Sequence, residues 1–489
     1  MSLSEEKSDS VASTELPYQA HLVDRDHVLR KLDWHLLPFV SLLYLLAFLD
    51  RTNIGNAKIA GLTTDLNLTG LQFNLCSAMF FIPYCLLDIP SNVAIKYFKP
   101  SRWIPSIMFC WGIIMLSMAF VKNFSGLMAV RILLGAAESG LFPGVSFYLC
   151  LWYPRDAQAR RLGIFTAASS MAGSAFGGIL AYAIERMNGI GGLAGWSWIF
   201  LLEGLVTVVV AISAYYYMED YPESASFLTN EEKEWLVQTI RADIVASSKA
   251  LKRKFLWQAL RDPHSYILAS MDLFVVIPLF SLALFLPTII VGLGYSSLHA
   301  QLLTIPPNIC GSIVTILIGA LSDRMRVRGP FVLAGACVTL TGYVLLYATT
   351  EPIVGYVGTL IAASGIYQAS TCVLAWTSAN AGGDIKRGTM IAIVSGIGNS
   401  GAIASSFIYR SADSPRYHPG HITNIACCCI LATLSIIGML EYMRLNRLKR
   451  AYCLKEGIDA SRYEEFSEMG DKSPLYGYVS SLWKPGRSY

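Results

Sequence analysis

Four charged residues of this 489-residue chain lie in long apolar stretches, where an ionisable side chain costs roughly 2.5–3.5 kcal/mol to insert into a membrane. Asp50 and Arg51 follow an apolar run that begins at Leu36 and is by itself too short to cross a bilayer, which takes about 20 residues. Arg131 and Glu138 are seven residues apart in another such stretch. Seven residues make two helical turns, so both side chains project from one face, about 10 Å apart. Residues this costly are expected to have a function.

The chemistry that these four residues predict is proton-coupled binding of an anion. A buried carboxylate stays charged while an arginine pairs with it, and it takes up a proton when an anionic substrate competes for that arginine. We therefore expect Glu138 and Asp50 to carry protons, and Arg51 and Arg131 to attract the substrate. The alternative for Asp50 and Arg51 is a satisfied internal ion pair.

The elements that hold these residues are predicted to be membrane-spanning helices. The chain is 54% hydrophobic and 15% charged, with a mean hydropathy of +0.47, whereas a soluble domain carries about a quarter charged residues. Its apolar residues form blocks long enough for a helix to cross about 30 Å of hydrocarbon. The pattern predicts an all-α membrane protein with twelve transmembrane helices, at residues 36–60, 72–95, 103–121, 127–150, 161–184, 196–217, 264–293, 299–321, 330–349, 353–379, 388–410 and 421–443.

The positive charges are distributed unevenly around these segments. With the N-terminus in the cytoplasm, the tails and inner loops hold 31 of the 38 Lys and Arg residues, a strong positive-inside bias. Both termini are therefore expected to be cytoplasmic. The polar first 34 residues do not have the pattern of a cleavable signal peptide. Two N-x-S/T sequons, at Asn67 and Asn123, fall on predicted outer loops and are candidate glycosylation sites.

The twelve segments fall into two sets of six around a polar middle. The expected organisation is an N-terminal tail (1–34), a six-helix bundle (35–218), a cytoplasmic loop (219–263), a second six-helix bundle (264–443) and a C-terminal tail (444–489). A capping box at Thr229 and Glu232 predicts a surface helix in the central loop. The basic loop at 96–102 is echoed by the loop at 323–330. Two six-helix halves with a repeated basic hinge resemble the major facilitator superfamily, in which two bundles rock around a central site.

Other kinds of chemistry find little support in the sequence. The chain contains no Gly-Lys pair, and therefore no Walker A loop for nucleotide. The spacing Gly396-x-Gly398-x-x-Gly401 lies in an apolar segment with no preceding strand, so we expect close helix packing there instead of a dinucleotide site. The eleven cysteines lack zinc-ligand spacing, and no metal or cofactor is expected. Scattered histidines disfavour a membrane enzyme, and the basic clusters are interpreted as topological anchors that bind no nucleic acid.

Short motifs in the first half carry a more specific resemblance. Residues 50–57 (DRTNIGNA), 88–92 (DIPSN) and 100–103 (PSRW), with the helix from Arg131 to Gly144, resemble the anion:cation symporter family. The segments at 200–204 (FLLEG) and 227–229 (FLT) resemble its fungal branch, which includes allantoate, nicotinate, pantothenate and biotin permeases. Asp88 stands where many members of the family have Glu, and the loop at 96–102 is a degenerate form of the family's loop.

The resemblance implies proton-coupled uptake of a small organic anion by alternating access. It assigns proton coupling and substrate attraction to the same four charged residues. By the same match, three further residues would line the substrate cavity: Tyr84, Trp376 and Asn399. The second basic loop would gate the bundles through Asp323, Arg324 and Arg328.

The leading hypothesis is therefore a proton:organic-anion symporter, for a carboxylate such as a vitamin or a nitrogen-source acid. Its expected partners are the anion, protons and the lipid bilayer, and the family places it in the plasma membrane. The direction of transport depends on gradients and stoichiometry, so a proton-driven exporter of a metabolite is one alternative. A transport-inactive nutrient sensor that signals through its tails is another.

Overall fold

The computed structural model describes residues 23–154, 157–158, 161, 165, 177–184, 186–248, 253–325, 327–382, 384–458 and 466–479, which form helices and connecting loops without any strand. The first half contains α1 (Arg25–Ala57), the π-turn η2 (Lys58–Leu62), α2 (Thr63–Asp65), α3 (Gly70–Tyr97), α4 (Pro100–Met118), α5 (Phe124–Glu138), α6 (Leu141–Trp152), η3 (Ile190–Gly192) and α8 (Gly195–Tyr217). The connecting segment contains η4 (Pro222–Ser224), α9 (Asn230–Ser248) and α10 (Arg253–Arg261). The second half contains α11 (Pro263–Gly292), α12 (Ser297–Leu303), α13 (Ile305–Met325), α14 (Gly329–Ala348), α15 (Pro352–Ala379), α16 (Asp384–Ser405), η5 (Ser411–Asp413), α17 (His418–Glu456) and η7 (Ser467–Lys472).

Capping side chains explain where several helices begin. The Asp24 carboxylate accepts from the backbone N–H of Asp26 at 3.0 Å and thereby starts α1 well before the predicted position at residue 36. Thr69 and Gln72 form a reciprocal capping box at the start of α3. The predicted capping box of the central loop is confirmed, because Thr229 and Glu232 exchange hydrogen bonds of 2.9 and 3.3 Å at the start of α9.

Ten helical stretches among the described residues are long and apolar enough to cross a membrane, and they match ten of the twelve predicted segments. Of the other two, the segment at 388–410 corresponds to α16, and the segment at 161–184 lies largely outside the described residues. Two helices differ from expectation. The segment at 127–150 is interrupted between α5 and α6, and α17 continues beyond the predicted end at residue 443 to Glu456.

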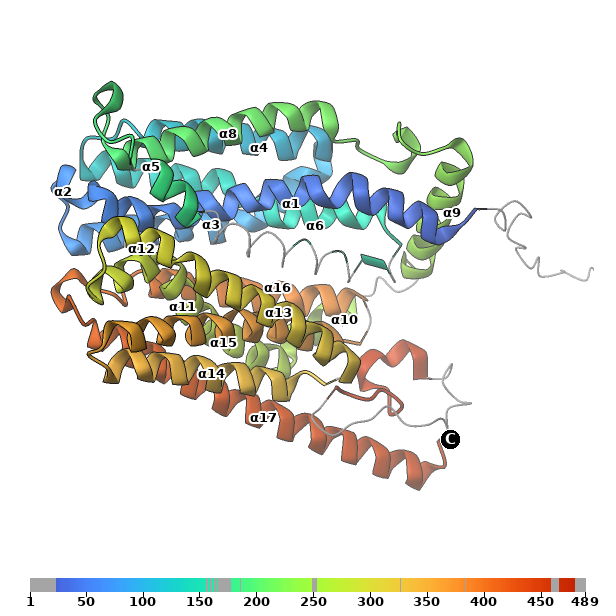
Figure 1. Cartoon of the computed structure of the whole chain (residues 1–489). Helices are drawn as coiled ribbons and strands as arrows, with labels where there is room; N and C mark the ends of the chain where they lie inside the picture. The colour runs from blue at the N-terminus through green and yellow to red at the C-terminus, as the bar shows by residue number, and fades with distance from the viewer. Residues whose placement is uncertain are drawn as a thin grey trace, which may run out of the picture.

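The helices pack as two bundles side by side, one formed by the first half of the chain and one by the second (Figure 1). Within the first bundle α4 packs on α8 and α3 on α5, and within the second α14 packs on α15 and α11 on α16. The beginning of α1 and the end of α17 lie at the same end of the molecule, here called the terminal end (Figure 1). The opposite end, which carries α2 and the start of α12, is called the loop end. Contacts of α1 with α11 and of α3 with α16 join the bundles.

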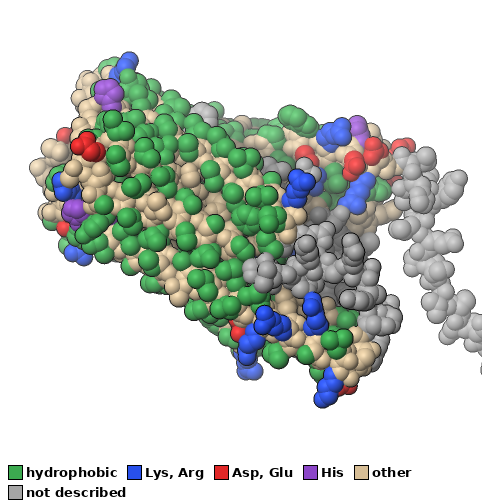
Figure 2. All heavy atoms as spheres, turned by 60° about the horizontal axis from the view of Figure 1, so that its bottom comes forward, with side chains coloured by type: hydrophobic (Ala, Val, Ile, Leu, Met, Phe, Trp, Pro, Cys, Tyr) green, Lys and Arg blue, Asp and Glu red, His purple; other side chains and the backbone are tan. Residues whose placement is uncertain are grey.

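The outer face of the bundles is apolar between two charged ends. Figure 2 shows hydrophobic side chains over most of the long face, with charged side chains gathered toward the two ends. Large apolar residues such as Ile316 and Leu317 of α13 are more than half exposed. A soluble protein does not leave so continuous an apolar face in water, whereas lipid covers it without cost.

Candidate functional site

The charged cluster is built on a close approach of α5 to α3. Gly135 lies against the backbone carbonyl of Phe80, where a Cβ atom would come within 2.0 Å of the oxygen. Only glycine permits this approach. Arg131 and Glu138 lie about one turn on either side of Gly135, so the same contact presses both side chains into the bundle. They are 0% and 1% exposed.

Glu138 is paired with α1 and not with its own helix. The Arg51 guanidinium donates to Glu138 Oε1 from Nε at 3.2 Å and also from Nη2. The expected common face of Arg131 and Glu138 is present, but the cation that contacts the carboxylate comes from a residue 87 positions away in sequence. Arg51 also lies over the Tyr84 ring, 4.6 Å from its centroid, so Tyr84 lies beside the Arg51–Glu138 pair.

Asp50 turns away from Arg51 toward α4 and α8. Its Oδ2 atom accepts from Trp111 Nε1 at 3.0 Å and from Thr207 Oγ1 at 3.2 Å. The alternative of an internal Asp50–Arg51 ion pair is therefore wrong, because successive residues of a helix point about 100° apart and these two face different neighbours. Asp50 is fully buried, and no arginine or lysine among the described residues is paired with it.

Arg131 is a buried cation with few hydrogen bonds. Its Nε atom donates to the carbonyl of Cys76 at a long 3.5 Å, and the guanidinium lies 4.8 Å from the centroid of the Phe80 ring. The Nη1 and Nη2 atoms have no hydrogen-bond partner among the described residues. A guanidinium carries five N–H donors in a planar fork that matches a carboxylate, so Arg131 has donors to offer to an anion.

The two cavity residues predicted in the second half take different positions. Asn399 is half-buried in α16, the helix that packs against α3 across the bundle interface. Trp376 lies near the end of α15, fully buried, and its indole N–H donates to the carbonyl of Val479 at 2.9 Å. The structure thus places Trp376 under the C-terminal segment at the terminal end, apart from the charged cluster. The position of Trp376 along its helix does not predict this contact, because Val479 lies in the C-terminal tail.

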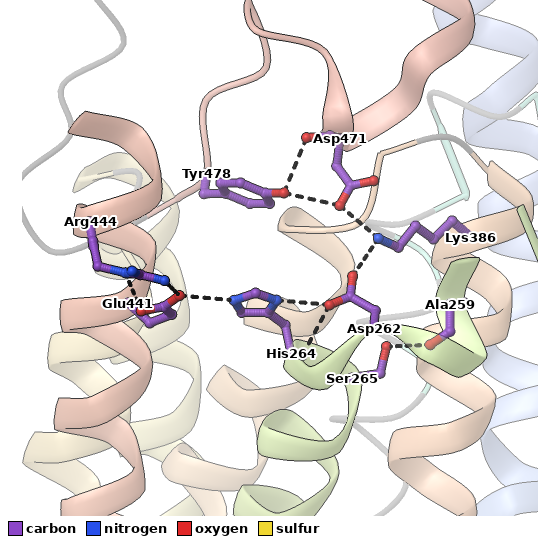
Figure 3. A network of polar contacts seen from close by, with 9 residues as sticks. All are labelled: Ala259, Asp262, His264, Ser265, Lys386, Glu441, Arg444, Asp471 and Tyr478. Atoms are coloured by element: carbon purple, nitrogen blue, oxygen red, sulfur yellow. Dashed lines mark hydrogen bonds and ion pairs between the residues drawn. The ribbon is translucent and has the colours of Figure 1, made fainter. Parts of the chain in front are cut away.

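The tail segment 466–479 is anchored by a buried polar network that sequence reasoning missed (Figure 3). Lys386 donates to Asp262 at 2.5 Å and to Asp471 at 2.7 Å, and the Tyr478 hydroxyl donates to Asp471 at 3.1 Å. His264 contacts both Asp262 and Glu441, which itself pairs with Arg444. The hydrogen bonds from His264 and Lys386 outweigh burial and hold the pKa of Asp262 below its usual range.

Each of the two basic loops, at 96–102 and 323–330, makes a polar contact with one aspartate. Arg328 pairs with Asp323 and donates from Nη1 to Ser322 at 2.9 Å, whereas Arg324 is exposed. In the first half, Asp220 accepts from the backbone N–H of Ser101 at 3.1 Å.

The glycosylation candidates lie at the loop end, where Asn67 and Asn123 are both exposed. The Asn123 side chain also caps α5 through the N–H of Gly126 at 2.8 Å.

Two further glycine contacts bear on the sequence-based expectations. A Cβ atom at Gly398 would meet the Asp272 carboxylate and one at Gly401 would meet α11, so close helix packing is confirmed at these two positions. A Cβ atom at Gly396 would meet nothing within 4 Å, so close packing does not explain the third glycine of the spacing. Among the described residues no group of three or more His, Cys, Asp and Glu is arranged to hold a metal ion.

One buried cation escaped the sequence analysis altogether. Lys58 falls near the end of the predicted helix at 36–60, but its Nζ atom is buried and has no hydrogen-bond partner among the described residues. It lies 4.8 Å from the centroid of the Phe73 ring and 5.1 Å from that of Phe285. A lysine near the end of an apolar segment gives no signal in the sequence that tells whether its side chain is exposed or buried.

Comparisons with known proteins identify relatives along most of the chain. The model of the Major Facilitator Superfamily matches residues 40–406. An uncharacterized transporter of Schizosaccharomyces pombe is 35% identical over 445 residues, covering 90% of this chain and 88% of that protein. The high-affinity nicotinic acid transporter of Saccharomyces cerevisiae is 31% identical over 469 residues, covering 95% of this chain and 86% of that protein.

Solved transporter structures share the fold at low identity. A bacterial homolog of the human lysosomal transporter Spinster, inward-facing and occupied, has a TM-score of 0.65 at 19% identity and covers 83% of this chain and 96% of that chain. The xylose transporter XylE from E. coli, partially occluded and inward open, has a TM-score of 0.60 at 15% identity and covers 81% and 96%. This two-bundle chain is a membrane transporter of the major facilitator superfamily and fits its fungal permease-like branch.

Proposed function

We propose that the protein is a proton-coupled symporter that imports a small organic anion by alternating access. The observation that carries the proposal is the arrangement of Arg51, Glu138 and Arg131. One buried arginine is held by a carboxylate, and a second lies beside it with both terminal nitrogens unpaired. An ion cluster selected only for stability would not leave a buried guanidinium in this state.

The arrangement supports a specific exchange of partners. A proton that binds Glu138 removes the charge that holds Arg51, and the substrate carboxylate then accepts from Arg51 and Arg131 together. When the anion leaves, Arg51 returns to Glu138 and the proton is released. Asp50 is the second proton-binding group of the proposal, because it is buried with hydrogen-bond donors but no paired cation. Asn399 and Tyr84 border the cavity in this scheme.

The orientation and the membrane follow from the charge distribution and the relatives. The bias of Lys and Arg toward the terminal end supports cytoplasmic termini, and the fungal permeases support the plasma membrane. With the termini inside, the loop end faces outward, and both sequons lie where glycosylation takes place. The name of the nicotinic acid transporter supports a monocarboxylate as the substrate. More than one proton per anion would add about 2.3 kcal/mol of driving force per net charge per 100 mV.

The deciding experiment is uptake into proteoliposomes with an imposed inward proton gradient. Labelled nicotinate, pantothenate, biotin and allantoate are offered to the wild type, to Glu138→Gln and to Glu351→Gln. Glu351 is an exposed carboxylate at the loop end and serves as the matched control. We expect the wild type and the control to concentrate one acid only with the gradient, and Glu138→Gln to exchange that acid without concentrating it.

Two results would contradict the proposal. Concentration of the acid by Glu138→Gln at the wild-type level would make Glu138 structural. Failure of all four acids to move would reject the substrate class, and the same vesicles with an outward gradient would then test export.

A further inference from the structure

The buried ammonium of Lys58 lies where the two bundles meet. Lys58 begins the π-turn η2 that follows α1 in the first bundle. Phe73, on α3, belongs to the same bundle, whereas Phe285, on α11, belongs to the other. The two rings are 6.5 Å apart in an edge-to-face arrangement. The ammonium therefore closes a contact between two bodies that alternating access requires to separate.

The surrounding contacts show how tightly the bundles are closed at this place. One turn before Lys58, a Cβ atom on Gly55 would come within 2.2 Å of the carbonyl oxygen of Leu284. Beside Phe285, the carbonyl of Tyr409 in the second bundle accepts from Asn74 of the first at 3.3 Å. All of these residues lie in the loop-end part of α1, η2, α3 and α11 or, for Tyr409, in the segment that follows α16. The contact is thus the closed side of the transporter in this conformation.

Aromatic rings are poor substitutes for an anion. A cation over a ring face is attracted by the ring quadrupole, but the ammonium keeps three N–H donors that a ring does not satisfy. No described carboxylate pairs with Lys58, and a cation is expensive to bury without a partner. Such a charge is retained in a membrane helix when another state of the protein uses it.

We infer that Lys58 is an anion-binding site at the loop end, which takes the carboxylate of the substrate when the two bundles part. This inference rests on the proposed function, because it gives the organic anion its first contact on the way in. Separation of the bundles removes Phe285 from the ammonium and opens its donors. When the bundles close, the ammonium returns to the two rings. The substrate carboxylate then binds the guanidinium groups of Arg51 and Arg131, which lie farther from the loop end.

The first part of the test reads the site without transport. Right-side-out vesicles are treated with a membrane-impermeant sulfonated amine-acylating ester, and acylation of Lys58 is measured by peptide mass spectrometry. Lys122, exposed at the same end, is the internal control. We expect slow labelling of Lys58 that is prevented by at least one of nicotinate, pantothenate, biotin and allantoate. We also expect that neutral nicotinamide does not prevent it and that Lys122 labelling is unchanged throughout.

The second part measures uptake of the acid that the wild type transports. Loss of a charge-assisted hydrogen bond predicts that Lys58→Gln raises the external KM about tenfold or more, while Lys122→Gln stays near the wild type. Absence of Lys58 labelling, labelling that none of the four acids prevents, or an unchanged KM in Lys58→Gln overturns the inference. If no acid is transported but one protects Lys58, the proposed function fails while the anion site stands.

Discussion

Two regions of the molecule bury cations and carboxylates to a similar depth, yet they treat their charges in opposite ways. At the terminal end, Lys386 is 1% exposed and donates to two carboxylates, at 2.5 and 2.7 Å. In the charged cluster, Arg131 is 0% exposed and its one hydrogen bond among the described residues is a 3.5 Å contact with a carbonyl. In the first network the ammonium is paired with two carboxylates, and these contacts fix the tail to the second bundle. The second has unused donors, which is what a binding site for an anion requires.

The largest effect is expected from removing the ammonium at the centre of the terminal network. Lys386→Met removes the ammonium that joins Asp262 and Asp471 and leaves them with His264 and the Tyr478 hydroxyl as their respective partners. Removing one partner of a buried ion pair costs about 3–5 kcal/mol of stability. The midpoint of thermal unfolding in detergent should fall sharply. Lys472→Met, which changes an exposed neighbour of Asp471, should leave the midpoint unchanged. Equal midpoints for the two variants would show that the network does not hold the fold.

Removing Arg131, the cation with unused donors, should reduce uptake and leave stability unchanged or higher. Arg131→Gln takes away donors to the substrate carboxylate, and a hydrogen bond to a charged group contributes about 1.5–3 kcal/mol, or roughly tenfold to a hundredfold in uptake. Because it also removes a buried charge without a full set of partners, the variant should unfold at the same temperature as the wild type or higher. Arg444→Gln, at an exposed ion pair, is the control. Loss of stability in Arg131→Gln with uptake retained would reverse the comparison.

The terminal network should also respond to acid. The pKa of Asp262 is depressed in the folded protein, so its ionised form stabilises the fold above the unfolded pKa of about 3.9. That contribution is lost as the pH falls below about 4, through the folded pKa. The unfolding midpoint of the wild type should drop between about pH 5 and pH 3 more steeply than that of Asp262→Asn. Parallel pH profiles would contradict the role given to Asp262.

The smallest effect is expected at Trp376. Trp376→Phe replaces the indole by a smaller ring and removes one hydrogen bond to the Val479 carbonyl, which contributes about 1 kcal/mol. Uptake should keep the KM of the wild type. A clear rise in KM with unchanged stability would return Trp376 to the substrate cavity, where family resemblance placed it.

Hydropathy predicted the helical segments well, because the cost of burying backbone and charge in lipid acts on every residue alike. The spacing of Arg131 and Glu138 likewise predicted a common face, since helix geometry is local. Pairing of Glu138 with Arg51 was not predictable, because it depends on how the tertiary structure brings α1 near α5 across 87 residues of sequence. The environment of Lys58 and the Trp376 contact depend on long-range packing in the same way. No pattern along one helix contains that information.

Because Gly55 lies so close to Leu284, the size of the side chain at position 55 should determine how often the loop end is closed. A methyl group at position 55 would meet the Leu284 carbonyl in this conformation, and separation of the two bundles would relieve that contact. Gly55→Ala is therefore expected to raise the free energy of the state with the loop end closed, without changing that of the state with the loop end open. The population should shift toward that open form without any change at a charged residue. Such a variant offers a way to trap the opposite conformation for ligands or antibodies that recognise it alone.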